Sequence, residues 1–389
     1  MNQLPKRKIA YIGIKALPAN AGVDTVVEKI VTRIDRARYE PTVYVNAALV
    51  SPDAAIPGVR LIRIRTLPGK YFNAPLLFLL SALHALFRGG YDLINVHSVE
   101  TCFVLPILRL RYKVVATAHG LLSKEPPELS KWGPLKPLLR LTELPFAYLS
   151  NARTSVSKPD TDYLEASYHR PVHYLPNGID ELRPDLDQAR ARLAEHGLEP
   201  GKYIIFTAGR IVPRKGCHFV LEALRQMKTD EKLLIVGDTS HVPEYTRQLL
   251  ALADDRVRFA GFISSKELLF GLIALSRLFV FPTTYEAMAI TLLEVAALKT
   301  PLIASDIPEN REVLPEQALF FKSADVADLR ARMEWALAHP AEMRDLAARA
   351  YQWVAENYRW PGIIAAYEQI YDQLLFNRRG AVQAARQPE

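Results

Sequence analysis

Residues 203–216 have the sequence YIIFTAGRIVPRKG, which joins a strand, a basic loop and the start of a helix. The β-branched and aromatic run Tyr203–Ala208 predicts a buried strand, and the apolar pattern after Gly216 predicts a helix. The loop between them carries Arg210 and Lys215. Free N–H groups at a helix start attract anions, and two cations strengthen that attraction. We therefore interpret this loop as a candidate phosphate site, with a basic surface loop as the alternative.

The same strand–loop–helix unit recurs on both sides of this stretch. Strands that alternate with helices predict a parallel sheet covered on both faces, so the expected fold class is α/β and doubly wound. The predicted strands are 8–14, 42–45, 61–65, 93–96, 114–118, 153–156, 203–208, 233–237, 257–260, 278–281, 302–304 and 319–321; the predicted helices are 23–37, 76–88, 135–149, 216–228, 243–253, 265–276, 287–298 and 325–338.

The alternation is interrupted once, near residue 180. Pro176-Asn177-Gly178 is typical of a turn, and more proline and glycine follow before the strands resume. A chain of 389 residues is too long for one core and suits two domains. We expect two Rossmann-like doubly wound parallel-sheet domains that face a central cleft, with the ligands bound there. The tail 377–389 is expected to be disordered.

The composition is that of an ordinary globular protein, with 49% hydrophobic and 23% charged residues. The formal charge is +7, which suits anionic lipid, nucleic acid or a phosphorylated substrate, although any single basic cluster can be a solvated face. Zinc-finger spacing and an aromatic-rich RNA signature are missing, so no nucleic-acid partner is expected. The two cysteines are far apart, and no apolar run is long enough for a membrane span. A cytoplasmic protein is the expectation.

Several motifs that would indicate other chemistry are absent. The first strand is not followed by G-x-G-x-x-G, and G-x-x-x-x-G-K-[ST], H-E-x-x-H and G-x-S-x-G do not occur. Two D-x-D triplets do occur, at Asp160 and Asp162 and at Asp185 and Asp187. Such a triplet can hold a divalent ion on a diphosphate. Each also precedes a helical pattern, so we interpret them as helix N-caps and expect no metal site.

A second candidate loop follows the strand that ends at Phe281. Residues 281–294 have the sequence FPTTYEAMAITLLE, with a helix expected from about Ala287. Glu286 would then lie at the mouth of the helix and Glu294 about 12 Å further along. Two carboxylates that far apart suit two hydroxyl groups of one extended ligand better than one glycosidic bond. An N-cap acid and a half-exposed helix residue are the alternatives, but the apolar neighbours of Glu294 favour a function.

Two loops in the first half also follow predicted strands. Residues 16–22 end in Ala-Asn-Ala-Gly, and Gly22 would allow a phosphate to approach the backbone closely. His119 follows the predicted strand 114–118 and precedes a glycine, which places it at the carboxyl edge of the sheet. A structural role is the alternative for a lone histidine.

Taken together, these motifs resemble the family-4 class of retaining glycosyltransferases with the GT-B fold. The resemblance covers nearly the whole chain: the first glycine loop, His119-Gly120, Ser155-Val-Ser157, residues 176–180, GRIVPRKG at 209–216, residues 234–237 and 257–261, the Glu286–Glu294 pair and residues 300–306. Residues 12–22, His119-Gly120 and Lys131-Trp-Gly133 resemble a subgroup that includes bacterial rhamnosyltransferases of surface polysaccharide assembly.

The resemblance implies domains and donor-site roles. Residues 1–178 would form the acceptor-side domain, 179–354 the nucleotide-sugar-binding domain, and 355–375 a helix that crosses back to the first. The donor would be a UDP-, GDP- or dTDP-sugar, with no cofactor or metal. Nucleotide-sugar-binding roles fall to Gly22, Arg210 and Lys215 on the phosphates, Ile263 at the base, Met288, Ala289, Ile290 and Thr291 through their amides, and Glu294 on the ribose.

His119 and Glu286 would contact the transferred sugar as catalytic residues, and the acceptor would be a glycan or lipid-linked glycan at an anionic membrane. Two departures from the family pattern stand out: Ala21-Gly22-Val23-Asp24 replaces Gly-Gly-x-Glu, and Glu286-Ala287-Met288-Ala289 replaces Glu-Gly-Phe-Gly. Since alanine tolerates a positive φ poorly, these loops can differ in geometry. An inactive nucleotide-sugar-binding partner, or a GT-B enzyme such as an epimerase or a phosphorylase, remains the alternative function.

Overall fold

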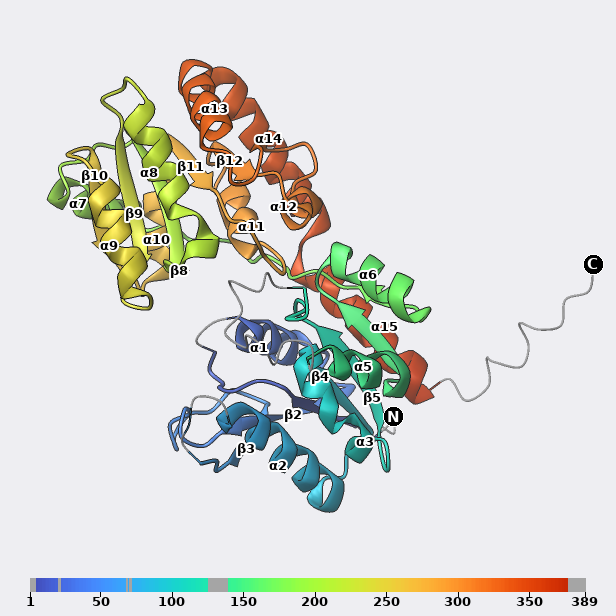
Figure 1. Ribbon diagram of the computed structural model, residues 1–389. Coiled ribbons are helices and arrows are strands. Elements are labelled where there is room, and N and C mark those ends of the chain that lie inside the picture. Colours follow the sequence, from blue (N-terminus) through green and yellow to red (C-terminus); the bar gives the residue numbers. More distant parts are fainter. Residues whose placement is uncertain (1–4, 20–21, 68, 70–71, 125–138, 377–389) are drawn as a thin grey trace, which may run out of the picture. The chain divides into compact units, whose positions relative to one another are not determined.

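The computed structural model describes residues 5–19, 22–67, 69, 72–124 and 139–376. The chain divides into two compact units (Figure 1). Unit 1 comprises Met1–Asn177 and Trp360–Glu389, and unit 2 comprises Gly178–Arg359. Each unit contains one parallel sheet with helices on both faces, so the predicted α/β, doubly wound fold class is confirmed. Residues 131–133 and the tail 377–389, which the sequence singled out, lie outside the described residues.

Unit 1 has a seven-stranded sheet in the order β3-β2-β1-β4-β5-β6-β7. One face is covered by α1 and α15, and the other by α2, η1, α3, α5 and α6. The elements are β1 (Arg7–Ile12), α1 (Val23–Arg33), β2 (Tyr39–Asn46), β3 (Arg60–Ile64), α2 (Asn73–Arg88), β4 (Leu93–His97), η1 (Val99–Val104), α3 (Leu105–Leu108), β5 (Lys113–Ala118), η4 (Arg140–Thr142), α5 (Glu143–Leu149), β6 (Ala152–Ser155), α6 (Lys158–Tyr168), β7 (His173–Tyr174) and α15 (Trp360–Phe376).

Unit 2 has a six-stranded sheet in the order β10-β9-β8-β11-β12-β13. Helices α8, α9 and α13 pack their apolar sides against one face of it. The elements are α7 (Leu186–Glu195), β8 (Tyr203–Arg210), η5 (Pro213–Lys215), α8 (Cys217–Gln226), β9 (Lys232–Asp238), α9 (Pro243–Leu252), β10 (Val257–Gly261), α10 (Lys266–Ala274), β11 (Leu278–Phe281), α11 (Ile290–Ala297), β12 (Leu302–Ser305), α12 (Pro308–Val313), β13 (Leu319–Phe321), α13 (Val326–Ala338) and α14 (Pro340–Asn357).

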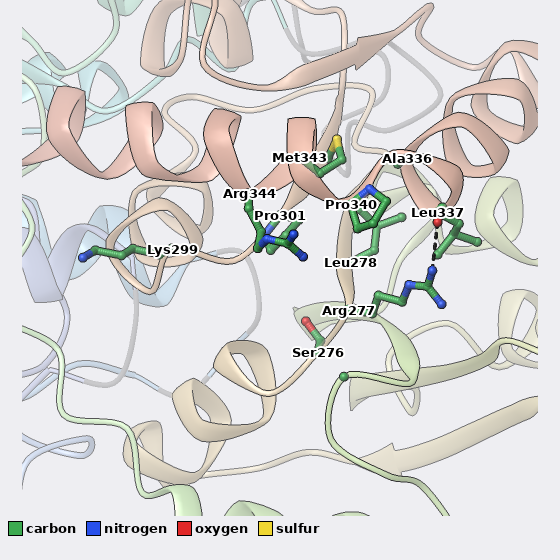
Figure 2. A pocket seen from close by; sticks show the side chains of 11 residues that line it. Ser276, Arg277, Leu278, Lys299, Pro301, Ala336, Leu337, Pro340, Met343 and Arg344 are labelled. Carbon is green, nitrogen blue, oxygen red and sulfur yellow. Dashed lines mark hydrogen bonds between the residues drawn. The ribbon is translucent and has the colours of Figure 1, made fainter.

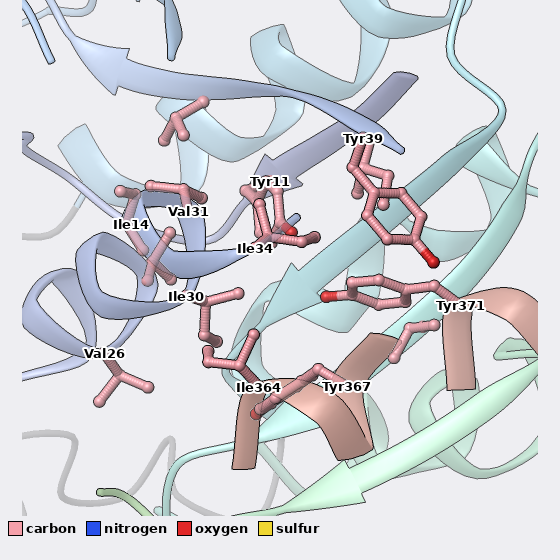
Figure 3. Close-up of a cluster of buried hydrophobic side chains, with 14 of the residues drawn as sticks. Tyr11, Ile14, Val26, Ile30, Val31, Ile34, Tyr39, Ile364, Tyr367 and Tyr371 are labelled. Atoms are coloured by element: carbon pink, nitrogen blue, oxygen red, sulfur yellow. The ribbon is translucent and has the colours of Figure 1, made fainter. Parts of the chain in front are cut away.

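The C-terminal helix completes the core of unit 1. Tyr367 and Tyr371 of α15 are fully buried beside Tyr11 and Tyr39 of the sheet (Figure 3). The Tyr371 hydroxyl accepts a hydrogen bond of 2.8 Å from the Asn95 amide, and Tyr39 meets Tyr371 edge to face. Asn95 and Tyr371, which are 276 positions apart in sequence, therefore share one core.

The predicted start of the C-terminal helix, residue 355, is wrong. α14 ends at Asn357 and α15 begins at Trp360. Pro361 cannot donate an N–H to a preceding turn, so a helix can begin there but cannot run through. The backbone between the two helices instead bridges to Ile179, whose N–H donates to the Tyr358 carbonyl at 2.7 Å.

Candidate active site

The strand order of unit 2 creates a topological switch point between β8 and β11. From β8 the chain continues towards β9, and from β11 it continues towards β12, so the two loops that leave these neighbouring strands diverge. Ligands of doubly wound sheets bind in the crevice at that point. The GRIVPRKG motif spans the end of β8 and the loop after it, and the loop after β11 carries Glu286. The structure therefore brings the two strongest candidate stretches to one place.

Close backbone packing joins these two loops. Gly216 has a φ of 72°, and a β-carbon on it would lie 2.1 Å from the Pro282 carbonyl oxygen. The Thr284 N–H donates to the Arg214 carbonyl at 2.9 Å. Only glycine fits at position 216, because both the positive φ and the short contact exclude a side chain.

Lys215 and Glu286 form the polar centre of this site. The Lys215 Nζ lies 2.5 Å from Glu286 Oε1, and the Thr283 hydroxyl donates to the same oxygen at 3.1 Å. The side chains retain 21% and 12% of their exposure, so the pair is partly shielded from water. Arg210 ends β8 with an exposed side chain. The site thus offers cations for an anionic group next to a carboxylate that can accept hydroxyl hydrogen bonds.

The start of the next helix corrects one prediction. α11 begins at Ile290 rather than near Ala287, so Glu286 lies in the loop and the estimated 12 Å along a helix does not apply. Met288 and Ala289 are buried ahead of the helix, and Ala289 has a φ of −81°. Ala287 and Ala289 stand where the family pattern has glycine, and neither has a positive φ. These two alanines therefore cause no backbone strain in this loop. Ile290 and Thr291 form the first turn of α11, and the Ile290 N–H donates to the Met288 carbonyl at 3.0 Å.

Glu294 lies on α11 and faces the start of α10. Its Oε1 is 3.7 Å from the Lys266 Nζ, and only 17% of its side chain is exposed, so the half-exposed alternative is wrong. Burial raises the pKa of this carboxyl, and the Lys266 ammonium opposes that rise. Ile263 is half-buried in the loop between β10 and α10. Glu294 is thus a carboxylate held in an apolar setting with one exposed cation beside it.

Gly22 belongs to unit 1, where it caps α1. Its φ is 62°, and a β-carbon would meet no atom within 4 Å. Asp24, in the first turn, accepts the N–H groups of Lys15 and Ala16 at 3.1 and 3.2 Å. These bonds fold the loop after β1 back onto the helix. Asn20 and Ala21, which precede Gly22 in this loop, lie outside the described residues.

His119 follows β5 in unit 1 and is paired with a residue that the sequence analysis missed. Its Nε2 lies 2.8 Å from Nδ1 of His97, the last residue of β4, and the two rings stack with centroids 5.1 Å apart. Burial lowers the pKa of His119 to about 3 and also lowers the pKa of His97. His97 was detectable in principle, because it directly follows the predicted strand 93–96, just as His119 follows the predicted strand 114–118.

The four aspartates of the D-x-D triplets have structural partners. Asp185 caps α7 by accepting the Gln188 N–H at 2.9 Å, as predicted. Asp160 is not an N-cap, because α6 begins at Lys158 and is capped by Ser157. Instead it is buried and forms an ion pair with Lys124. Asp162 and Asp187 pair with Lys158 and Arg190 on their own helices.

A cavity of about 440 Å³ lies elsewhere in unit 2 (Figure 2). It is lined by Leu278 and Pro301, which stand at the amino ends of β11 and β12, and by the junction of α13 and α14. The Arg277 guanidinium beside it already donates to the Leu337 carbonyl and pairs with Glu231. The cavity is therefore at the opposite edge of the sheet from the Lys215–Glu286 pair.

Comparison with known proteins matches both halves of the chain to glycosyltransferase domains. Residues 20–183 match the model described as Glycosyltransferase Family 4, and residues 189–353 match Glycosyl transferases group 1. The MMP alpha-(1->4)-mannosyltransferase of Mycolicibacterium hassiacum is 25% identical over 327 residues, which span 78% of this chain and 76% of that protein.

Two solved structures share the fold at low identity. Sucrose-phosphate synthase from Thermosynechococcus elongatus has a TM-score of 0.77 at 22% identity, covering 95% of this chain and 99% of its own. Anabaena Alr3699/HepE in complex with UDP and glucose has a TM-score of 0.76 at 17% identity, covering 94% and 100%. The chain therefore carries the two domains of a glycosyltransferase with the GT-B fold, a Glycosyltransferase Family 4 domain followed by a group 1 domain.

Proposed function

We propose that this protein is a retaining, metal-independent hexosyltransferase. It moves a sugar from a UDP-, GDP- or dTDP-sugar to a hydroxyl group of a glycan or lipid-linked glycan in bacterial surface polysaccharide or glycolipid biosynthesis. The observation that carries the proposal is the Lys215–Glu286 pair at the switch point of unit 2, within the group 1 domain.

In this proposal, each polar group of the site binds one part of the nucleotide-sugar donor. Lys215 and Arg210 bind the diphosphate, since an ammonium and a guanidinium both suit phosphate oxygens. Glu286 exchanges its contact with Lys215 for hydroxyl groups of the sugar, and amides of Met288, Ala289, Ile290 and Thr291 bind sugar or phosphate oxygens. Glu294 accepts hydrogen bonds from the ribose, and Ile263 packs against the base. In unit 1, the loop at Gly22 accepts a phosphate and His119 contacts the sugar.

The proposed chemistry needs no separate base. The acceptor hydroxyl attacks from the face that the diphosphate leaves, and the leaving oxygen takes the acceptor proton. The protein then has one main electrostatic task, which is to stabilise the charge that develops on the departing diphosphate. Fixed cations and helix amides stabilise such charge without reorganising during the step. Lys215 and Arg210 can supply that positive charge in place of a divalent ion.

The alternative of an inactive nucleotide-sugar binder was based on the replaced glycines. In the loop after Glu286, neither replaced position has a positive φ, whereas Ala21 of the first loop lies outside the described residues. An inactive binder would bind the donor tightly without turnover. The other alternative is a GT-B enzyme of another reaction class. An epimerase consumes its donor without an acceptor, whereas a transferase does not.

A thermal-shift panel tests the donor site first. The full chain is heated with UDP, GDP, dTDP and their sugar conjugates, in Mg²⁺ and in a chelator. We expect stabilisation by one nucleotide family, independent of metal and lost in Lys215→Ala. Product formation with that donor then requires an acceptor, and the product keeps the donor's anomeric configuration by NMR. A requirement for Mg²⁺, or an inverted anomer, contradicts the corresponding part of the proposal.

A peripheral membrane contact belongs to the same proposal. None of the helices within the described ranges has both the length and the apolar content that a membrane span requires. The segment η4–α5 instead exposes an apolar stripe formed by Leu141, Leu144 and Tyr148. Its acidic residue, Glu143, is buried, and Arg140 and Arg170 flank the stripe. An apolar face edged by cations suits an anionic lipid surface at the inner side of the membrane.

A further inference from the structure

His97 and His119 lie at the carboxyl ends of two neighbouring parallel strands of unit 1. His97 is the last residue of β4, and His119 is the first residue after β5. Side chains alternate along a strand, so the layer below them contains Asn95 and Thr117. Those two side chains are hydrogen-bonded at 3.1 Å, and Thr154 of β6 donates to Thr117 at 2.8 Å. The histidine pair is therefore the outermost layer of a buried polar ladder.

The position of His97 is tightly constrained. Its side chain is fully buried, and its ring stacks against Tyr11 of β1 with centroids 6.0 Å apart. Its carbonyl oxygen lies so close to Gly13 that a β-carbon there would be 2.0 Å away. His119 is only half-buried, so one side of its ring reaches the carboxyl edge of the sheet. His97 thus forms a rigid support, and His119 is the member of the pair that a ligand can reach.

The hydrogen bond between the two rings restricts their protonation. Burial favours the neutral form of both, and no acidic side chain in the described part of the chain forms an ion pair with either ring. Two neutral imidazoles can share a hydrogen bond only if one ring nitrogen donates and the other accepts. The 2.8 Å contact joins His97 Nδ1 to His119 Nε2, so two arrangements of the protons remain.

The far nitrogen of His97 distinguishes the two arrangements. His97 Nε2 is buried and has no hydrogen-bond partner among the described residues. If His119 donated, His97 would carry its proton on Nε2 as an orphaned N–H group. If His97 donated from Nδ1, the same Nε2 would be a bare acceptor. Buried N–H groups without a partner are rarer than unpartnered acceptors. The second arrangement is therefore favoured, and it leaves the proton of His119 on Nδ1.

We propose that His97 is the positioning residue of His119: it accepts no proton itself, but fixes the tautomer in which His119 presents an Nδ1–H donor to an oxygen atom of the bound ligand. This inference rests on the proposed function for the identity of that oxygen, a sugar hydroxyl or a phosphate. His119 acts as a neutral hydrogen-bond donor and not as a general acid or base. The ligand must therefore place a hydrogen-bond-accepting oxygen opposite the Nδ1–H group of His119. An analogue that lacks this oxygen binds less well.

The tautomer is tested directly by NMR on the full chain with ¹⁵N-labelled histidine. Long-range ¹H–¹⁵N spectra identify which ring nitrogen carries the proton, and the His119 signals are assigned from their loss in His119→Asn. We expect the neutral Nδ1–H tautomer, unchanged between pH 6 and pH 8. A neutral Nε2–H tautomer, or a ring that gains a proton within that range, overturns the proposal. This readout needs no donor, so it is independent of the proposed reaction.

Two substitutions at position 97 separate positioning from packing. His97→Asp can only accept at neutral pH, so it forces His119 to donate through Nε2 and reverses the tautomer. We expect kcat/KM to fall by about 10²-fold or more, with KM raised as well as kcat lowered, because the lost donor contacts the bound ligand. His97→Asn can still donate, so it retains the Nδ1–H signal and activity within about 10-fold of the wild type. Equal losses in both variants, with the wild-type tautomer kept in both, indicate a structural role and overturn the proposal.

A control variant tests the NMR assignment, and the activity assay separates the positioning role of His97 from the proposed reaction. His218→Asn removes a histidine in unit 2 that contacts Tyr245, and it should leave the His119 spectrum unchanged. If the wild type shows the expected tautomer but transfers no sugar from any donor, the reaction is wrong and the positioning assignment stands. If transfer occurs but the tautomer is reversed, the positioning assignment is wrong and the reaction stands.

Discussion

The Pro282 carbonyl oxygen occupies the space that a side chain at Gly216 would need, at 2.1 Å from the position of its β-carbon. This contact joins the basic loop after β8 to the residue that follows β11, and it places Lys215 next to Glu286. The sequence motif GRIVPRKG ends in a glycine because the backbone of a neighbouring strand passes this close. Gly216 is therefore a packing requirement as well as a turn residue.

Replacement of Gly216 by alanine should lower both stability and donor binding. The left-handed φ of 72° alone costs an alanine about 1–3 kcal/mol, and the contact with Pro282 adds to that cost. We expect a lower free energy of unfolding in urea and a weaker thermal shift with the preferred nucleotide. Gly209→Ala is the matched control, since a β-carbon there meets no atom within 4 Å. Equal stability of the two variants would contradict the structure of this loop.

Loss of Lys215 should remove activity while leaving the fold intact. In the proposed mechanism Lys215 stabilises the departing diphosphate, and a comparable fixed donor contributes about 10²–10³-fold to kcat, so Lys215→Ala should lose about that much. Glu286→Ala should also cut turnover strongly, since it removes the contact to the sugar. Sugar transfer and far-ultraviolet circular dichroism are measured on each variant. Lys228→Ala, an exposed lysine of the same unit, should retain full activity. Full activity in either site variant would disprove its assigned role.

Glu294→Gln should separate stability from donor binding. Burial raises the pKa of Glu294, so the folded state binds its proton more tightly than the unfolded state does. Stability from this group is therefore present below the unfolded pKa of about 4.3 and is lost as the pH rises through the higher folded value. The glutamine cannot ionise, so we expect an equal or higher Tm than wild type at pH 7 and a weaker dependence of Tm on pH.

Glu294→Gln should also weaken the binding of the nucleotide. A carboxylate accepts two ribose hydroxyls with charge-assisted hydrogen bonds, whereas the glutamine amide offers one acceptor oxygen. We expect about 10-fold weaker binding of the preferred nucleoside diphosphate. Glu267→Gln, on the neighbouring α10, is the control and should change neither property. A strong loss of stability at neutral pH, without any loss of affinity, would show that Glu294 is a structural residue.

The sequence predicted the architecture well because the strands are strongly apolar. All twelve predicted strands occur, as runs such as Leu278–Phe281 have a clear boundary and β-branched or aromatic content. The two-residue β7 was missed, because a pair such as His173–Tyr174 has no period of its own. The helix start at Ile290 was placed three residues early, because propensity does not distinguish helix from a packed loop in the segment 287–289.

The site was predictable only in part. Residues of one short motif, such as Arg210 and Lys215, could be grouped from their spacing. The ends of parallel strands could be assigned to one edge of a sheet. The direct contact between Lys215 and Glu286 depends on β8 and β11 being neighbours, which spacing alone does not specify. The pairing of His97 with His119 depends on the register of β4 and β5. The ion pair of Asp160 with Lys124 likewise required tertiary structure.

The C-terminal helix makes a specific contribution to unit 1 that Tyr371→Phe can measure. The substitution keeps the ring but removes the acceptor for the Asn95 amide, which is buried. An unsatisfied buried donor costs about 1–3 kcal/mol. We expect urea denaturation to shift to lower concentration by a corresponding amount. Tyr351→Phe, on α14 and partly exposed, should have no measurable effect. No loss in Tyr371→Phe would mean that the Asn95–Tyr371 hydrogen bond does not contribute to the stability of unit 1.

The apolar stripe on η4–α5 should bind anionic membranes. Leu141, Leu144 and Tyr148 can each insert an apolar side chain into a lipid surface, while Arg140 and Arg170 attract anionic headgroups. We expect the full chain to sediment with vesicles that contain anionic lipid, and to be released as salt shortens the electrostatic range to about 8 Å at 0.15 M. Neutral vesicles should bind much less.

Substitutions then locate the contact. The triple variant Leu141→Ser, Leu144→Ser and Tyr148→Ser should bind anionic vesicles at least about 10-fold more weakly, since each buried side chain contributes about 1.5–3 kcal/mol when fully inserted. Phe87→Ser is the matched control, because Phe87 is exposed on α2 of the same unit but lies outside the stripe. If Phe87→Ser weakens binding and the triple variant does not, the contact is made by the end of α2 and not by the stripe. If neither changes binding, the attraction is purely electrostatic, and the stripe has no part in it.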